Sequence, residues 1–263
     1  MSFWSDYGIG VSTHLDAIRF VRRHRLWGYF LYPVILLVIL AIAGFFSIFA
    51  FSHYLTDWLF SFLQTDFHTG EDWLDGFLQL LLWIVKFLAS FVIRIYIFLL
   101  ALKVIRYIVL ILCSPMMALV SEKVEELVTG NSYPFNFAQF LKDVLRGVLV
   151  NLRNLAFELS ITIALLVVGW IPVIGLITVP VSLLVSWYFL GFNMIDYTCE
   201  RRRMSVSEGA RFIRKRKGIA IGNGMIFSWL LLVPFVGLII APVPSSVAGT
   251  LAALEAMDGK RSQ

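Results

Sequence analysis

The chain has 263 residues, of which 59% are hydrophobic and only 15% are charged, and its formal net charge is +5. Soluble domains contain about 45–50% apolar and about 25% charged residues, so this composition excludes an ordinary soluble domain. No basic stripe is paired with the exposed aromatic residues that single-strand binding needs, and we therefore expect no nucleic-acid partner.

The N-terminal segment, residues 1–25, is polar and ends in a basic run. Its apolar residues recur at helical spacing, at Val11, Leu15 and Ile18. This pattern predicts an amphipathic helix that lies on the membrane surface.

The next two apolar runs predict two full transmembrane helices. Residues 26–51 contain no charged side chain, and about 20 apolar residues span a bilayer. The loop 52–76 carries five acidic residues and no Lys or Arg. Residues 77–128 form a run longer than the membrane is thick, which predicts a long transmembrane helix that continues beyond the bilayer.

Residues 135–153 repeat apolar side chains at three-four spacing, with Lys142, Asp143 and Arg146 between them. This pattern predicts an amphipathic helix. Two placements are open for it, at the membrane interface or packed on neighbouring helices.

An internal repeat, Pro-x-x-Gly-Leu-Ile-x-x-Pro, occupies the centre of two apolar stretches, 155–196 and 219–257. Its fixed positions are Pro172, Gly175 and Pro180 in the first copy, and Pro234, Gly237 and Pro242 in the second. Each helix leading into the repeat is expected to be about 24 Å long or less, whereas the hydrocarbon core is about 30 Å thick. We therefore predict two re-entrant helical hairpins, because broken backbone inside a membrane must be buried in protein or line a cavity. The alternative is two ordinary hairpins whose tips reach the far side.

Lys and Arg residues set the orientation of the single membrane domain, residues 1–263. The loop 197–218 is basic, and its stretch from Glu200 to Lys217 holds eight Lys or Arg against two Glu. The positive-inside rule therefore predicts an inner-membrane protein of a bacterium, with both termini cytoplasmic and the loop 52–76 outside. Within the basic loop, Ser205 and Glu208 have the spacing of a capping box that opens a short helix. Its basic residues suit anionic lipid headgroups, or are ordinary positive-inside charge.

The sequence contains none of the common nucleotide-binding, metalloprotease or hydrolase motifs, so we expect neither an enzyme nor a cofactor or metal. Lys86 and Arg94 lie within the second transmembrane run, where charge is usually functional or paired. The functional interpretation is a cationic lining that attracts anions. The alternative is pairing, for example with Glu158, or snorkelling to an interface.

The basic run that ends the first segment contains Arg22, Arg23 and Arg25. Guanidinium forks match tetrahedral oxyanions and stay charged at every working pH. We predict that these arginines gather anions on the cytoplasmic side. The alternative is that they only fix the orientation of the chain and contact lipid headgroups.

The ordered set of elements resembles the CysZ-type sulfate permease family over about residues 16–254. Five local strings carry the resemblance: Ser114-Pro115, Thr129-Gly130, Ile171–Gly175, Asp196-Tyr197 and Val233–Pro242. The resemblance implies sulfate uptake for cysteine synthesis without ATP hydrolysis, and a symmetric homo-oligomer in the lipid bilayer. It also implies two full transmembrane helices and two partly penetrating helical hairpins.

At one place the chain departs from this family. The family has one or two arginines, linked to sulfate binding, just before the proline that corresponds to Pro33. This chain has Trp27 and Gly28 at those positions, so the resemblance assigns no sulfate-binding arginine here. Besides sulfate uptake, two other functions are open: a permease for a different small anion, and a non-transporting scaffold or membrane-shaping protein.

Overall fold

A computed structural model of the chain describes residues 2–36, 38–39, 72–130, 136–169, 172–233 and 236–258. Every regular element within these ranges is a helix, which confirms the predicted all-α class. The chain divides into two compact units, one formed by Met1–Leu37 with Tyr107–Gln263 and the other by Val38–Arg106. The described part of the second unit is chiefly the first half of helix α3, Asp72–Thr129.

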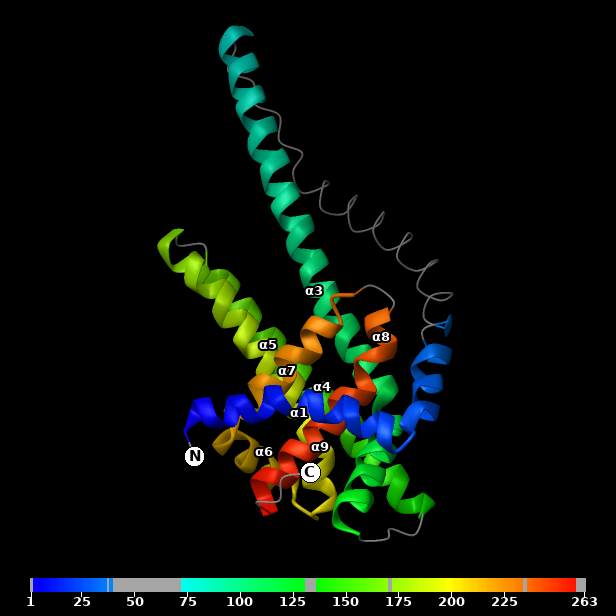
Figure 1. The fold of residues 1–263 in the computed structure, drawn as a ribbon. Coiled ribbons are helices and arrows are strands. Elements are labelled where there is room, and N and C mark those ends of the chain that lie inside the picture. The colour runs from blue at the N-terminus through cyan, green and yellow to red at the C-terminus, as the bar shows by residue number, and fades with distance from the viewer. Residues whose placement is uncertain are drawn as a thin grey trace. The chain divides into compact units, whose positions relative to one another are not determined.

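The described residues of the first unit form further helices besides the end of α3 (Figure 1). They include α1 (Phe3–Arg23), η1 (Leu26–Phe30), α4 (Phe137–Gly169), α5 (Pro172–Arg201), α6 (Val206–Lys215), α7 (Lys217–Leu230), α8 (Val236–Ile240) and α9 (Pro242–Asp258).

Four described segments are long and apolar enough to cross a membrane: Lys103–Thr129, Phe137–Gly169, Gly175–Arg201 and Val236–Met257. They support a multi-pass membrane protein. The transmembrane helix predicted at 26–51 lies largely outside the described residues, and its described start is the short apolar helix Leu26–Leu36.

Helix α4 is a single long helix where the sequence predicted two separate elements. An amphipathic helix ending at 153 and a hairpin arm starting at 155 are a single helix of 33 residues, about 50 Å long. No Pro or Gly lies between Asn154 and Val168 to end it. The length argument for a re-entrant first hairpin was therefore wrong, although α7, with 14 residues and about 21 Å, is as short as expected. Re-entrant insertion of the hairpins stays a prediction.

Helices α4 and α1 turn their apolar faces outward. On α4 the large apolar residues of the predicted stripe, such as Leu141, Leu145 and Leu152, are exposed, while the buried face is polar or small. Helix α1 shows the same inversion, since Leu15 and Ile18 are exposed. Lipid is as apolar as these side chains, so in a membrane they gain nothing by packing on each other, and small and polar residues face the neighbouring helices instead.

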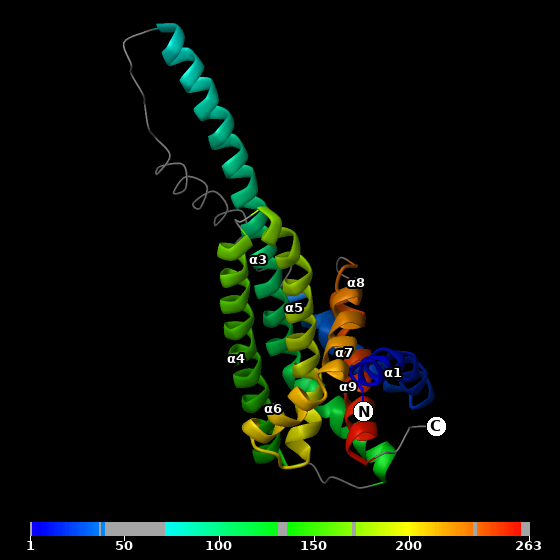
Figure 2. The ribbon, with the colours of Figure 1, turned by 90° about the vertical axis from the view of Figure 1, so that its left-hand side faces the viewer.

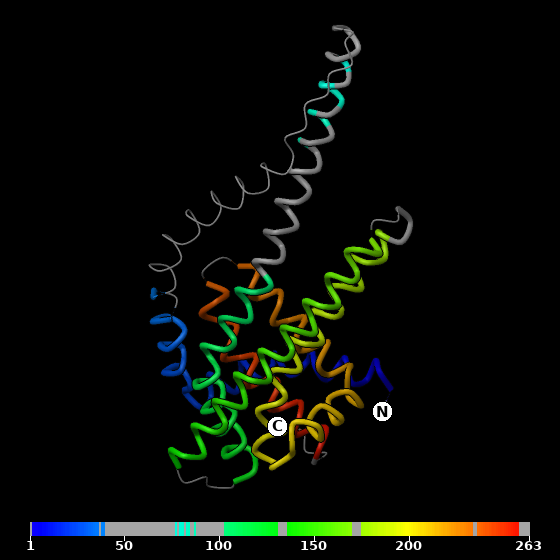
Figure 3. Tube along the Cα trace, turned by 180° about the vertical axis from the view of Figure 1, so that it is seen from behind, coloured from blue at the N-terminus to red at the C-terminus, as the bar shows by residue number. Residues whose placement is uncertain are grey.

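Helix α7 packs between α5 and α1, and small residues allow the close approach. A Cβ atom at Gly191 of α5 would collide with the carbonyl oxygen of Ala220, and one at Gly224 of α7 would collide with that of Trp187. Small residues at helix crossings permit such backbone contact in membrane proteins. Figure 2 shows α5, α7 and α1 in this order, and Figure 3 shows the same crossing from behind.

Helix α1 is tied to the last helices of the chain by polar contacts. Arg216, at the start of α7, donates from Nη1 to Oδ1 of Asp6 at 3.0 Å. The Tyr7 hydroxyl donates to the sulfur of Met225 at 3.0 Å. The first and last parts of the sequence therefore form one packed layer around α7.

Candidate functional site

The buried face of α4 forms a polar seam inside the first unit. Its buried residues recur every three or four positions: Asp143, Gly147, Val150, Asn151, Asn154, Glu158 and Thr162. This spacing places them on one side of the helix, against α5 and the end of α3. The amphipathic pattern predicted from the sequence concerned the opposite, apolar face of this helix, so the seam was not predicted. The three-four spacing of Asn151, Asn154 and Glu158 was the signal that could have found it.

Glu158 lies at the centre of the seam, where its side chain is 1% exposed. Its Oε2 accepts a hydrogen bond from the Tyr107 hydroxyl at 2.8 Å, and its Oε1 accepts one from the Ser186 hydroxyl. Three helices, α3, α4 and α5, thus converge on a single carboxyl group. An acid inside a segment apolar enough to cross a membrane is costly to place there, and such groups usually serve a transport path or are held by partners.

Amide side chains extend the seam one turn from Glu158. Asn154 of α4 donates from Nδ2 to Oδ1 of Asn193 on α5, at 2.5 Å. Within the described part of the chain, no hydrogen-bond partner is present for Nδ2 of Asn193, for Oδ1 of Asn151 or for either amide atom of Asn223. Buried polar atoms nearly always have partners, so these unpaired amide atoms are unusual for a packed interior.

A layer of ion pairs lies at the ends of α4 and α5 that adjoin α6. Arg146 donates from Nη2 to Asp196 at 3.3 Å and from Nη1 to the carbonyl oxygen of Met204 at 2.6 Å. Arg201 contacts Glu122 at 2.7 Å. These guanidinium groups are neutralised by carboxylates of neighbouring helices, so they fix the helices in place and are committed to the fold.

The predicted cluster of arginines at the end of α1 differs from this layer in its lack of carboxylate partners among the described residues. Arg22 and Arg23 are exposed in the last turn of α1, and Arg25 follows with a left-handed φ of 54°. Among the residues that the structure describes, no acid forms an ion pair with any of the three, whereas Arg19 on the same helix pairs with Asp16 at 3.4 Å. The cluster therefore presents uncommitted guanidinium groups where α1 gives way to η1.

The two predicted intramembrane cations, Lys86 and Arg94, belong to α3, and their side chains lie outside the described residues. The pairing of either one with Glu158 stays a prediction.

The first copy of the internal repeat lies at the start of α5. Pro172 is the first residue of this helix, and its side chain lies outside the described residues. A Cβ atom at Gly175 would lie 2.6 Å from the carbonyl oxygen of Gly169, at the end of α4. Pro180 lies inside α5, which continues past it. The glycine therefore allows the two arms of the hairpin to meet.

The second copy makes the same contact with a different helix pattern. Pro234 lies outside the described residues, Gly237 is buried in α8, and Pro242 begins α9. A Cβ atom at Gly237 would collide with the carbonyl oxygen of Leu230, the last residue of α7. In each tip a glycine lies against the backbone of the opposing helix. The second tip differs because the chain after it forms two separate helices, α8 and α9.

Known proteins resemble this chain along most of its length. The family described as sulfate transporter CysZ/etoposide-induced protein 2.4 matches residues 13–242. The sulfate transporter CysZ of Pseudomonas aeruginosa is 28% identical over 250 residues, covering 94% of each chain. That of Pseudomonas paraeruginosa is 28% identical over 237 residues, covering 89% of each chain. A third, from Pectobacterium atrosepticum, is 31% identical over 134 residues, covering 50% of this chain and 49% of the relative.

The matched region runs from the middle of α1 to the first residue of α9 and so includes the polar seam, the ion-pair layer, the arginine cluster and both repeats. The predicted relationship is confirmed: this chain belongs to the family of sulfate transporter CysZ and etoposide-induced protein 2.4.

Proposed function

We propose that this chain is a permease that moves sulfate, or a similar small oxyanion, across the bacterial inner membrane without ATP hydrolysis. The sulfate taken up would supply cysteine synthesis. The observation that carries the proposal is the family match over residues 13–242, together with relatives named sulfate transporters that align along nearly the whole chain.

The inward polar faces of the helices support transport. An anion loses its hydration when it enters a membrane protein, and it needs replacement dipoles along its path. The amides of Asn151 and Asn193 are buried in the seam and each has an unpaired polar atom, while the outward faces of α4 and α5 are apolar. A passage along the α4–α5 seam would meet the amide dipoles of Asn151, Asn154 and Asn193.

We place the first contact with the anion at Arg22, Arg23 and Arg25. The support is their exposure and their lack of a carboxylate partner among the described residues, in contrast to Arg146 and Arg201. Guanidinium groups bind oxyanions through paired N–H donors. Lys86, Arg94 and the hairpin tips at Gly175 and Gly237 remain the candidates for deeper contacts.

The experiment is uptake of radioactive sulfate into proteoliposomes that contain the purified full chain and no nucleotide. We expect uptake above that of protein-free liposomes, with competition by unlabelled sulfate and weaker competition by chloride. Uptake equal to that of protein-free liposomes, from protein shown to be inserted, would contradict the proposal. Stronger competition by phosphate or chloride than by sulfate would assign the permease to that anion instead.

A further inference from the structure

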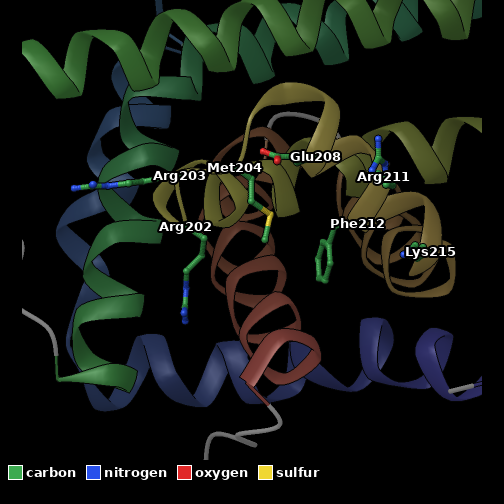
Figure 4. A pocket seen from close by; sticks show the side chains of 7 residues that line it. All are labelled: Arg202, Arg203, Met204, Glu208, Arg211, Phe212 and Lys215. Atoms are coloured by element: carbon green, nitrogen blue, oxygen red, sulfur yellow. The ribbon is translucent and has the colours of Figure 1, made fainter.

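A surface cleft of about 450 Å³ opens directly after α5, between the turn that follows this helix and α6. It is lined by Arg202, Arg203, Met204, Glu208, Arg211, Phe212 and Lys215. Figure 4 shows Met204 and Phe212 pointing the same way beneath the turn, with Arg202 on one side and Lys215 on the other. The cleft thus combines an apolar wall with cationic edges.

The lining of the cleft contains more cationic than acidic side chains. The single acid, Glu208, accepts hydrogen bonds at 2.8 Å from both the backbone N–H and the hydroxyl of Ser205, and these bonds lower the pKa of its carboxyl. Arg202 pairs with Glu125 at 2.9 Å. Arg203, Arg211 and Lys215 have no ion pair with any acid that the structure describes.

The turn that lines the cleft is held by hydrogen bonds within the protein before any ligand binds. Arg203 has a left-handed φ of 55°, uncommon outside glycine, and its N–H donates to the carbonyl oxygen of Glu200 at 2.8 Å. The carbonyl oxygen of the next residue, Met204, accepts from Arg146, which is itself held by Asp196. Since buried ion pairs hold the turn, little order has to be gained when a ligand binds.

We propose that this cleft binds the phosphate of an anionic phospholipid headgroup, through Arg211 and Lys215, which lie one turn apart on α6 (Figure 4). Its location favours lipid over a free oxyanion, because the lining begins at Arg202, the residue after the apolar segment Gly175–Arg201. The apolar wall of Met204 and Phe212 favours lipid too, since a free oxyanion has no apolar part to place there. Basic residues at a membrane surface each attract anionic lipid by about 1 kcal/mol, or about fivefold in affinity.

The loop offers a matched pair of double variants. Arg211→Gln with Lys215→Gln removes one Arg and one Lys from the cleft, and Arg214→Gln with Lys217→Gln removes the same charges from exposed positions that do not line it. Binding of phosphatidylglycerol to the purified full chain is measured by native mass spectrometry, with phosphatidylcholine as the neutral comparison. We expect the cleft variant to lose about thirtyfold in affinity for phosphatidylglycerol, and the control variant less than threefold.

Equal losses in the two variants would overturn the proposal, because they would assign lipid binding to the overall charge of the loop. A charge-conserving variant, Arg211→Lys with Lys215→Arg, should bind within about threefold of the unmodified chain, which separates lost charge from misfolding. In a second arm, inorganic phosphate is added as competitor. Displacement of the lipid by millimolar phosphate would also overturn the proposal, since it would identify a site for free oxyanions.

Discussion

His14 is a buried titratable side chain that joins the first and last helices of the first unit. Its Nδ1 lies 3.2 Å from the carbonyl oxygen of Gly10, and its Nε2 lies 3.4 Å from the Ser245 hydroxyl. Because a carbonyl can only accept, Nδ1 carries the proton of the neutral ring and Nε2 accepts from the serine. Burial lowers the pKa of His14 from 6.5 to about 4.

This lowered pKa predicts a loss of stability in mild acid. The folded chain keeps His14 neutral down to about pH 4, whereas the unfolded chain binds a proton near pH 6.5, so protonation favours unfolding. The stabilisation is complete above pH 6.5 and falls as the pH drops through the window to about 4, by about 3 kcal/mol in total. Thermal unfolding at several pH values should show a shallower slope for His14→Gln than for the unmodified chain. Identical slopes would show that His14 does not titrate in this way.

A second prediction at this scale concerns Arg22, Arg23 and Arg25. Replacing all three by Lys keeps the charge that orients the chain but removes the paired N–H geometry that binds oxyanions. We expect normal insertion, with sulfate affinity in proteoliposomes lowered about tenfold, equal to about 1.4 kcal/mol. The control is Arg19→Lys on the same helix, where the side chain already pairs with Asp16. If the triple variant matches the control in affinity and flux, the anion contact lies elsewhere.

At the scale of the elements, the hairpin tips carry a clear prediction. Gly175→Val and Gly237→Val would each push a branched side chain into the carbonyl oxygen of the opposing arm. Overpacking of this kind costs about 1–3 kcal/mol or more, because backbone cannot move aside as a side chain can. We expect reduced yield of monodisperse protein and reduced flux in both variants. Gly8→Val is the control, since no atom lies within 4 Å of a Cβ atom there. Unchanged assembly and flux in both tip variants would contradict the contacts described.

Local sequence signals predicted some elements well. The capping box at Ser205 and Glu208 is present, and Gly130 ends α3 in the left-handed conformation that glycine adopts easily. These features depend on interactions within a few residues. The continuity of α4 was missed because a change from amphipathic to fully apolar pattern near 153 was read as a boundary, although no helix-breaking residue lies there.

The orientation of each helix face was harder to predict. A periodic pattern shows that α4 has an apolar side and a polar side, but it does not say which side faces protein. In water the apolar side is buried, whereas in lipid the polar side is. The seam around Asn154 and Glu158 therefore became visible only with the neighbouring helices in place. The arginine cluster could be named from sequence, but the absence of carboxylate partners around it among the described residues could not.

For the whole molecule, the distribution of charge predicts the orientation in the membrane. Both native cysteines, Cys113 and Cys199, are buried, so a cysteine introduced at the surface can be labelled selectively. We expect a membrane-impermeant reagent to label Thr65→Cys from outside and Ser207→Cys only from inside, as the positive-inside rule requires. Thr65 itself lies outside the described residues. Labelling of both positions from both sides would indicate protomers inserted in two orientations.

The packing of α1 against α7 and α9 has a consequence for the order in which the chain folds. Asp6 meets Arg216 across 210 residues of sequence, and His14 meets Ser245 across 231. Helix α1 precedes α7 and α9 in the sequence, so the helices that hold it are not yet available when α1 is synthesised. Truncation after α6 would leave α1 without these helices.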